Sequence, residues 1–136
     1  MKYLVDANVL SEATKPRPDA RVVQWLRDHE AELAVSTIVL GELEYGILLL
    51  PSGKRRNRLE DWFQQGVNRL RTLDFDVATA SAWANMLAKL KQKGLAMSVK
   101  DSQIAASASL HGLIVVTRNV DHFRHAGVKL ENPFAP

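Results

Sequence analysis

The stretch Leu113-Ile114-Val115-Val116-Thr117 decides the fold class, because it is a short, almost wholly apolar run. A strand that alternates apolar and polar residues has one solvated face, whereas an uninterrupted apolar run is typical of a strand covered on both faces. Such strands occur mainly in parallel sheets that carry helices on either side. The stretch therefore predicts an α/β fold.

The rest of the chain alternates between short apolar runs and longer segments whose apolar residues recur at helical spacing. We expect further strands at residues 2–5, 33–36 and 73–75, and helices at residues 19–30, 37–50, 54–72, 78–93 and 99–111. Strands that alternate with helices build a sheet between two helical layers. The sequence thus predicts a three-layer α/β/α sandwich with a central, mainly parallel sheet. Because no repeat or linker divides the chain, we expect one domain over residues 1–136.

The composition narrows the class of protein. The chain has 136 residues, of which 46% are hydrophobic, and this is enough for one domain with a buried core. It contains no cysteine, so disulfides and thiolate ligands for zinc are not available. Its apolar runs are far shorter than the roughly 18 residues that a membrane span needs. We therefore expect a cytoplasmic protein that does not interact with a membrane.

The formal net charge is +3, and part of the positive charge is clustered. Lys54, Arg55, Arg56 and Arg58 stand together at the start of a predicted helix. Clustered cations neutralise nucleic-acid phosphates and release their counterions, so we predict that these four residues bind nucleic acid. A solvated helix face explains the same cluster equally well.

Three acids stand singly among apolar residues. Asp6 ends the first predicted strand, Glu42 lies in the helix after the second, and Asp101 opens the helix before the apolar strand. In open parallel sheets the ligand site lies beyond the carboxyl ends of the strands, where the winding reverses. We therefore expect these acids to converge.

Each acid also has a purely structural explanation. Asp6 is suited to cap a helix, and Ser98 with Asp101 fits the capping-box pattern. Helical periodicity does not distinguish Glu42 from Glu44, since both have apolar neighbours. Together, however, acids at one sheet edge would repel one another unless a cation neutralised them. Magnesium is the expected ion, because it prefers oxygen ligands and binds through one or two carboxylates together with substrate phosphates.

Two other enzyme classes fit less well. A phosphatase of the dehalogenase type needs a second aspartate two residues after the first as general acid, and position 8 is Asn. His122 and His125 could be drawn as a metal site, but two histidines in a loop more often face solvent.

Four sequence blocks form a recognisable pattern. Val5-Asp6-Ala7-Asn8-Val9-Leu10-Ser11-Glu12 resembles the opening D-x-N block of PIN-domain toxins of the VapC type. Ser36-Thr37-Ile38-Val39-Leu40-Gly41-Glu42-Leu43-Glu44-Tyr45-Gly46 is similar to their second block, and Asp101-Ser102-Gln103-Ile104-Ala105-Ala106 to their third. Val116-Thr117-Arg118-Asn119-Val120-Asp121-His122-Phe123 resembles the fourth, and Asn132-Pro133-Phe134 the closing segment of the FitB-like subgroup. The blocks occur in order and span nearly the whole chain.

The resemblance implies a PIN fold and the activity of an endoribonuclease that depends on Mg²⁺ or Mn²⁺, as the toxin of a type II toxin-antitoxin system. It assigns the second-block acid to Glu42 and not Glu44. It further implies an antitoxin partner, an RNA substrate and a homodimer. The implied roles are as follows: Asp6, Glu42 and Asp101 are catalytic; Asp6 and Asp101 bind the metal, with Asn119 and Asp121 as further ligands; Asn8 and Thr117 support the site.

One position departs from the pattern. Some relatives carry a fourth acid where this chain has Asn119, and Asp121 follows two residues later. A neutral amide would weaken metal affinity without abolishing it.

The alternative function is that of a nucleic-acid-binding PIN-like partner, which acts with its antitoxin as a co-repressor and has no significant nuclease activity. The retained acids argue against it.

Overall fold

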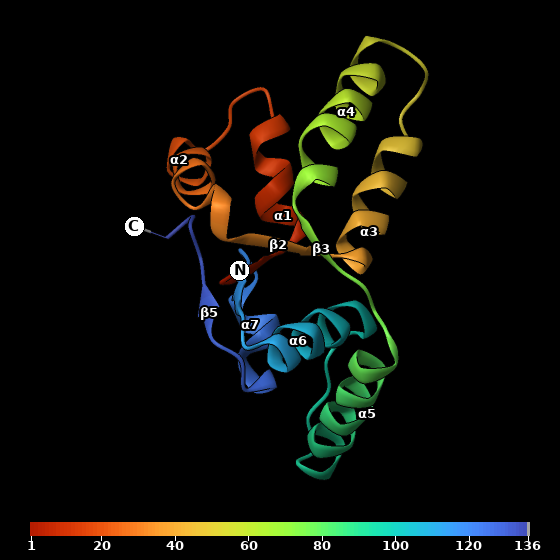
Figure 1. Cartoon of the computed structure of the whole chain (residues 1–136), viewed down its shortest axis with the longest axis vertical. Coiled ribbons are helices and arrows are strands. Elements are labelled where there is room, and N and C mark those ends of the chain that lie inside the picture. Colours follow the sequence, from red (N-terminus) through yellow and green to blue (C-terminus); the bar gives the residue numbers. More distant parts are fainter. Residues whose placement is uncertain (136) are drawn as a thin grey trace.

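A five-stranded parallel sheet forms the middle layer of the computed structural model, which describes residues 1–135 (Figure 1). The strands are β1 (Tyr3–Val5), β2 (Leu33–Ser36), β3 (Arg71–Leu73), β4 (Ile114–Val116) and β5 (Leu130–Glu131). Their order in the sheet is β3-β2-β1-β4-β5, and every neighbouring pair is parallel. Residue 136, the last of the predicted domain, lies outside the described part.

The central strand β1 fixes the place where the winding reverses. Tyr3 pairs with Leu33 of β2 on one side and with Ile114 of β4 on the other. The chain adds β2 and β3 outward from one side of β1, and β4 and β5 outward from the other side. The carboxyl ends of β1 and β4 therefore meet at the reversal point, where the sequence predicts the site.

Helices cover both faces of the sheet, as the sequence predicts. Figure 1 shows α1 (Ala7–Leu10), α2 (Ala20–Asp28), α3 (Thr37–Leu48) and α4 (Lys54–Gln65) above the strands, and α5 (Val77–Gln92), α6 (Val99–His111) and α7 (Val120–Phe123) below them. Short 3-10 turns complete the connections at Ser11–Thr14, Glu30–Glu32, Val67–Arg69 and Arg124–Ala126. The three-layer α/β/α prediction is confirmed. No helix among residues 1–135 combines the length and apolar character needed to cross a bilayer.

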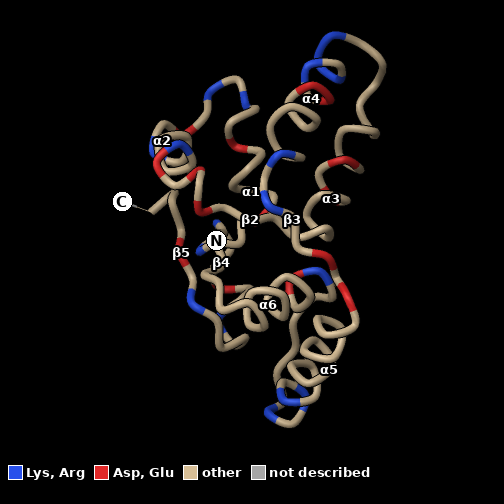
Figure 2. Tube along the Cα trace, in the orientation of Figure 1, with Lys and Arg blue, Asp and Glu red and all other residues tan. Residues whose placement is uncertain are grey.

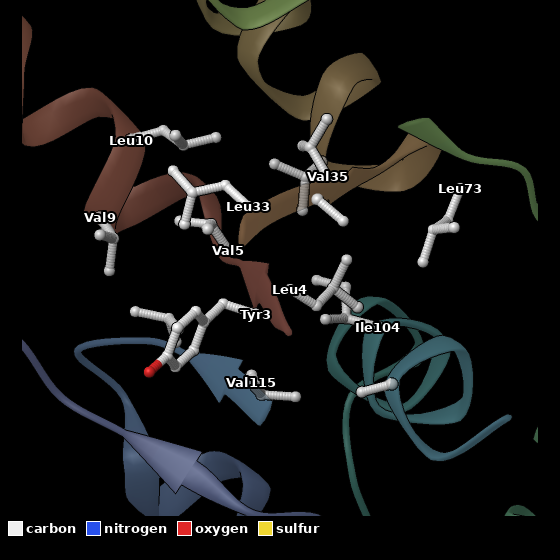
Figure 3. Packing of buried hydrophobic residues seen from close by; sticks show 14 of the residues in the cluster. Tyr3, Leu4, Val5, Val9, Leu10, Leu33, Val35, Leu73, Ile104 and Val115 are labelled. Atoms are coloured by element: carbon white, nitrogen blue, oxygen red, sulfur yellow. The ribbon is translucent and has the colours of Figure 1, made fainter. Parts of the chain in front are cut away.

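The core explains why the central strands are apolar throughout. Leu4, Val35 and Val115 are fully buried. Figure 3 shows Val9 of α1 on one side of these strands and Ile104 of α6 on the other. Burying each such side chain contributes roughly 1.5–3 kcal/mol relative to leaving it exposed. Both faces of the strands are therefore covered with hydrophobic side chains, so few polar residues occur in them.

The segment between α4 and α5 differs from the sequence prediction. The helix expected over residues 54–72 ends at Gln65, and the strand expected at 73–75 lies at Arg71–Leu73. Gly66 follows the helix, and a Cβ atom there would lie 2.9 Å from the Trp62 carbonyl oxygen. The helical spacing of apolar residues extends past the end of α4, because Val67 in the following 3-10 turn is also buried in the core. Pairing of Arg71 with Ala34 then draws the chain into the sheet earlier than its apolar pattern indicates.

Candidate active site at the carboxyl edge of the sheet

Asp6 stands at the end of β1 and caps α1. Its Oδ1 accepts a hydrogen bond of 2.8 Å from the Ala7 backbone N–H, so the structural explanation of this acid is correct in part. Its other oxygen, Oδ2, accepts a 2.8 Å hydrogen bond from the Thr117 hydroxyl, which follows β4. Asp6 is 3% exposed, and a cap alone does not require this degree of burial. One carboxylate therefore joins the two strand ends at the reversal point.

Asn8 and Thr117 hold this carboxylate in place through hydrogen bonds. The Asn8 amide nitrogen lies 3.4 Å from both Asp6 Oδ2 and Thr117 Oγ1. Its amide oxygen accepts a 3.1 Å hydrogen bond from the Arg118 backbone N–H. Thr117 Oγ1 in turn accepts from the Asn119 backbone N–H at 3.0 Å. Asp6 thus has a fixed orientation before any ligand arrives.

The negative charge of the Asp6 carboxylate is only partly compensated by its surroundings. Burial raises the pKa of its carboxyl group above the ordinary value, and the charge of Glu42 acts in the same direction. The hydrogen bonds from Thr117 and Ala7 and the charge of Lys100 lower the pKa, but burial outweighs them. A buried carboxylate in this condition favours a nearby cation.

Glu42, not Glu44, faces the site. Glu44 is exposed, whereas Glu42 Oε2 forms an ion pair with Lys100 of α6. The other oxygen, Glu42 Oε1, is buried and has no hydrogen-bond partner among the described residues. Helical periodicity did not separate the two glutamates; the contact between α3 and α6 does.

Lys100 is the site residue that sequence reasoning missed. Its ammonium group interacts electrostatically with the carboxylates of Glu42, Asp6 and Asp101. Burial lowers its pKa, but the hydrogen bond and the charge of Glu42, with the charges of the other two acids, produce a net rise. One signal could have identified it, because a lysine in the first turn of a helix opposes the helix dipole.

Asp101 lies at the start of α6 with its carboxylate at the edge of the site. Its backbone N–H donates to Ser98 Oγ at 3.1 Å, which is the first half of the capping box. Its carboxylate Oδ2 lies 3.5 Å from His122 Nδ1. Asp101 is 9% exposed, so the carboxylate is nearly buried at the edge of the site.

The remaining predicted residues are more exposed than Asp6 and Asp101. Asn119 is exposed and contacts the site through its backbone N–H. The Asp121 side chain is 74% exposed and pairs with Arg124. His122 and His125 are both exposed.

The basic cluster occupies the start of α4, away from the sheet (Figure 2). Arg56 donates to Glu60 Oε1 at 2.8 Å and to the Leu50 carbonyl at 3.3 Å, so it braces the turn between α3 and α4. Lys54, Arg55 and Arg58 are exposed.

The donor set at the sheet edge fits a hard divalent cation. As they stand, no three acidic or histidine side chains within residues 1–135 are close enough to ligate one ion together. The Glu42 carboxylate is instead paired with Lys100. However, the negative charge of the buried Asp6 carboxylate is only partly balanced by its surroundings. Glu42 Oε1 is buried and has no hydrogen-bond partner among the described residues. One or two such carboxylates, completed by water, are what Mg²⁺ usually takes.

Comparisons with known proteins agree with this geometry. The PIN-domain family model matches residues 3–129. The chain is 37% identical to toxin FitB of Neisseria gonorrhoeae, over 96% of this chain and 97% of that protein. It is 36% identical to the VapC ribonuclease Y4jK of Sinorhizobium fredii, over 98% of both chains. The structure of FitAB bound to an IR36 DNA fragment matches with a TM-score of 0.92 and 34% identity, over 98% of this chain and 96% of that one. The resemblance drawn from the four sequence blocks is thereby confirmed, and the chain belongs to the PIN-domain family, in the group that includes the VapC and FitB toxins.

Proposed function

We propose that this protein is the toxin of a type II toxin-antitoxin pair and hydrolyses RNA as a divalent-metal-dependent endoribonuclease in the cytoplasm. The observation that carries the proposal is the buried Asp6 carboxylate, which Thr117 holds at 2.8 Å and which acts on the charge of Lys100 together with Glu42 and Asp101. The related protein Y4jK of Sinorhizobium fredii is named a VapC ribonuclease, which supports this activity. We propose Mg²⁺ as the metal, with Mn²⁺ as the alternative, because every donor is oxygen.

Asp6 and Asp101 would hold the ion, and Glu42 would complete the acidic set. When bound, such an ion activates water and offsets the charge that develops on the leaving oxygen of a phosphodiester. Asn8 and Thr117 orient Asp6, because they bond to the oxygen that its helix cap leaves open. Asn119 would add an amide oxygen, and the hydrogen bond from its backbone N–H to Thr117 Oγ1 supports this assignment. Asp121 stays the alternative fourth ligand.

The RNA substrate would be held by positive charge on α4. Lys54, Arg55 and Arg58 are exposed and free to reach phosphates, whereas Arg56 is engaged with Glu60. The distance of this cluster from the sheet edge suits a long RNA that extends beyond the cleaved bond (Figure 2).

An apolar groove supports the antitoxin as partner. It has a volume of about 390 Å³ and is lined by apolar side chains that include Leu10, Leu26 and Trp62. A second hollow of about 490 Å³ shares Trp62 and is edged by Arg55 and Arg58. We propose that an amphipathic antitoxin helix with acidic flanks lies here, as in other helix-in-groove complexes. Helix α1 carries both Leu10, which lines the groove, and the site residue Asn8, so an occupant of the groove would contact the helix that holds Asn8.

A different surface supports the predicted homodimer. Tyr45, Leu48 and Leu49 at the end of α3 are 65%, 55% and 67% exposed. Adjacent exposed side chains of this size are typical of an interaction surface, and a second copy of the chain is the occupant that we propose.

Expression of the chain without a partner tests the function. We expect growth arrest, and we expect Asp6→Asn and Asp101→Asn to abolish it while the protein stays folded. Glu44→Gln is the matched control and should remain toxic, because Glu44 is exposed and lies on the same helix as Glu42. Folded Asp6→Asn and Asp101→Asn variants that remain as toxic as the parent would show that the metal-site assignment is wrong. A free chain that cleaves no RNA would favour the alternative of a binding co-repressor without nuclease activity.

A further inference from the structure

Lys100 occupies the position where the acids of the site need positive charge. Its ammonium group forms an ion pair with Glu42 Oε2, and the charges of Asp6 and Asp101 also act on it. These three carboxylates come from the end of β1, from α3 and from the start of α6. A single ammonium group of the chain itself thus stands among the acids assigned to the metal.

The neutralisation by Lys100 is partial. It satisfies one oxygen of Glu42, while Glu42 Oε1 stays buried without a hydrogen-bond partner among the described residues. A divalent ion carries twice the charge and accepts several oxygens at once, so it suits the same acids better.

The Lys100 side chain can leave without disturbing the acids. It is 44% exposed, and its long stem allows the ammonium group to turn into solvent. The start of α6 is held independently, because Ser98 Oγ accepts from the Asp101 N–H and the Ser98 carbonyl accepts from the Ser102 N–H at 3.0 Å. Asp101 therefore keeps its place when Lys100 moves.

We propose that Lys100 is an internal counter-ion that neutralises the acids in the metal-free protein and is displaced from Glu42 when a divalent cation binds. The proposal rests on the metal site of the proposed function. An ammonium group and a divalent ion at the same carboxylates repel each other strongly where water is partly excluded. Metal binding is then an exchange of one cation for another, and its affinity is reduced by the ion pair that must be broken.

A purely structural ion pair is the competing explanation. In that case Lys100 would join α3 to α6 in every state, and its removal would loosen the site and weaken metal binding. The two explanations predict opposite changes in metal affinity.

Calorimetric titration of Mg²⁺ into the purified, metal-free chain separates them. We expect Lys100→Gln to bind Mg²⁺ about tenfold more tightly than the parent, since about 1.4 kcal/mol corresponds to a factor of ten. In the presence of a chelator, the thermal unfolding midpoint of Lys100→Gln should lie below that of the parent. Saturating Mg²⁺ should raise the midpoint of Lys100→Gln by more than it raises that of the parent. The control is Lys91→Gln, which removes an exposed lysine from the end of α5 and should change neither quantity.

A second measurement uses the unaltered chain. The resonance of the Lys100 Cε–Hε groups should move toward that of a free lysine as Mg²⁺ is added, while other lysines stay unchanged. Unchanged or weaker Mg²⁺ binding in Lys100→Gln, together with a static Lys100 resonance, would overturn the counter-ion proposal and leave the metal site intact. If neither the parent nor the variant bound Mg²⁺ or Mn²⁺, the metal site itself would be wrong.

Discussion

The Thr117 hydroxyl donates to Asp6 Oδ2 over 2.8 Å and so joins the carboxyl ends of β4 and β1. The two residues are 111 positions apart in the chain, yet both are buried. Because Asp6 Oδ1 is bonded to the Ala7 N–H, the Thr117 contact fixes the rotation of the carboxylate.

Thr117→Val should impair the site more than the fold. Valine keeps the shape but removes the hydroxyl, which leaves Asp6 Oδ2 and the Asn119 N–H short of a partner. We expect unfolding in denaturant to show a loss of about 1–3 kcal/mol. RNA cleavage should fall about 10–100-fold, as is usual for residues that orient metal ligands. Thr117→Ser should restore most of the activity, and a fully active valine variant would contradict this role.

Glu12 should make stability depend on pH. A hydrogen bond from the Asp19 backbone N–H holds its pKa below the ordinary value of 4.5, and Lys15 adds to the effect. A carboxyl with a lowered pKa stabilises the folded state above its unfolded pKa, and this contribution is lost as the pH falls through the folded value. We therefore expect Glu12→Gln to be less stable than the parent at pH 7 and to approach it in acid.

The measurement for Glu12 is denaturant unfolding at a series of pH values. Glu30→Gln serves as control, because Glu30 is exposed. A gap between the parent and Glu12→Gln that stays constant from pH 7 down to pH 3 would show that the Glu12 charge is not its source.

The basic residues of α4 should separate into two roles. Replacing Lys54, Arg55 and Arg58 with alanine should weaken RNA binding and reduce the slope of log affinity against log salt by about two. Arg56→Ala should instead lower the unfolding free energy, by about 1 kcal/mol or less, because its bonds to Glu60 and the Leu50 carbonyl are lost. An unchanged salt slope in the triple variant would assign these residues to a solvated face.

The fourth metal ligand can be located by two opposite substitutions. Asn119→Asp should tighten Mg²⁺ binding, because it adds a negative charge next to Thr117. Asp121→Asn should leave affinity unchanged, because the exposed Asp121 side chain pairs with Arg124. Calorimetric titration of Mg²⁺ into both variants makes the comparison. The reverse pattern would identify Asp121 as the ligand.

The fold could be predicted from the sequence to a large extent, because hydrophobic patterning reports burial directly. The α6 helix begins at Val99 and ends at His111 as expected, since Ser98 caps its start and Gly112 adopts a left-handed conformation at its end. Strand β5 was not predicted, because two half-buried residues, Leu130 and Glu131, carry no pattern. They join the sheet only because β4 offers a free edge.

The candidate site was less accessible to sequence reasoning. Asp6 could be proposed from the fold, because it follows a strand end, where the topology gathers side chains. Asn8 and Thr117 could be proposed only from the family resemblance. Lys100 was harder to find, because its role depends on α3 and α6 bringing Glu42 to it across 58 positions of sequence. Its one local signal, a lysine in the first turn of a helix, does not reveal this long-range pairing.

Cleavage of an end-labelled RNA by the purified chain tests the account most directly. The chain should cut internal phosphodiester bonds in Mg²⁺, lose this activity in chelator, and regain it when Mg²⁺ or Mn²⁺ is restored. Asp6→Asn should lack activity under all these conditions, while Glu44→Gln should cut as the parent does. Cleavage that persists in chelator, or that Asp6→Asn retains at the parental rate, would contradict the central claim that the acids at the carboxyl edge of the sheet form a metal-dependent ribonuclease site.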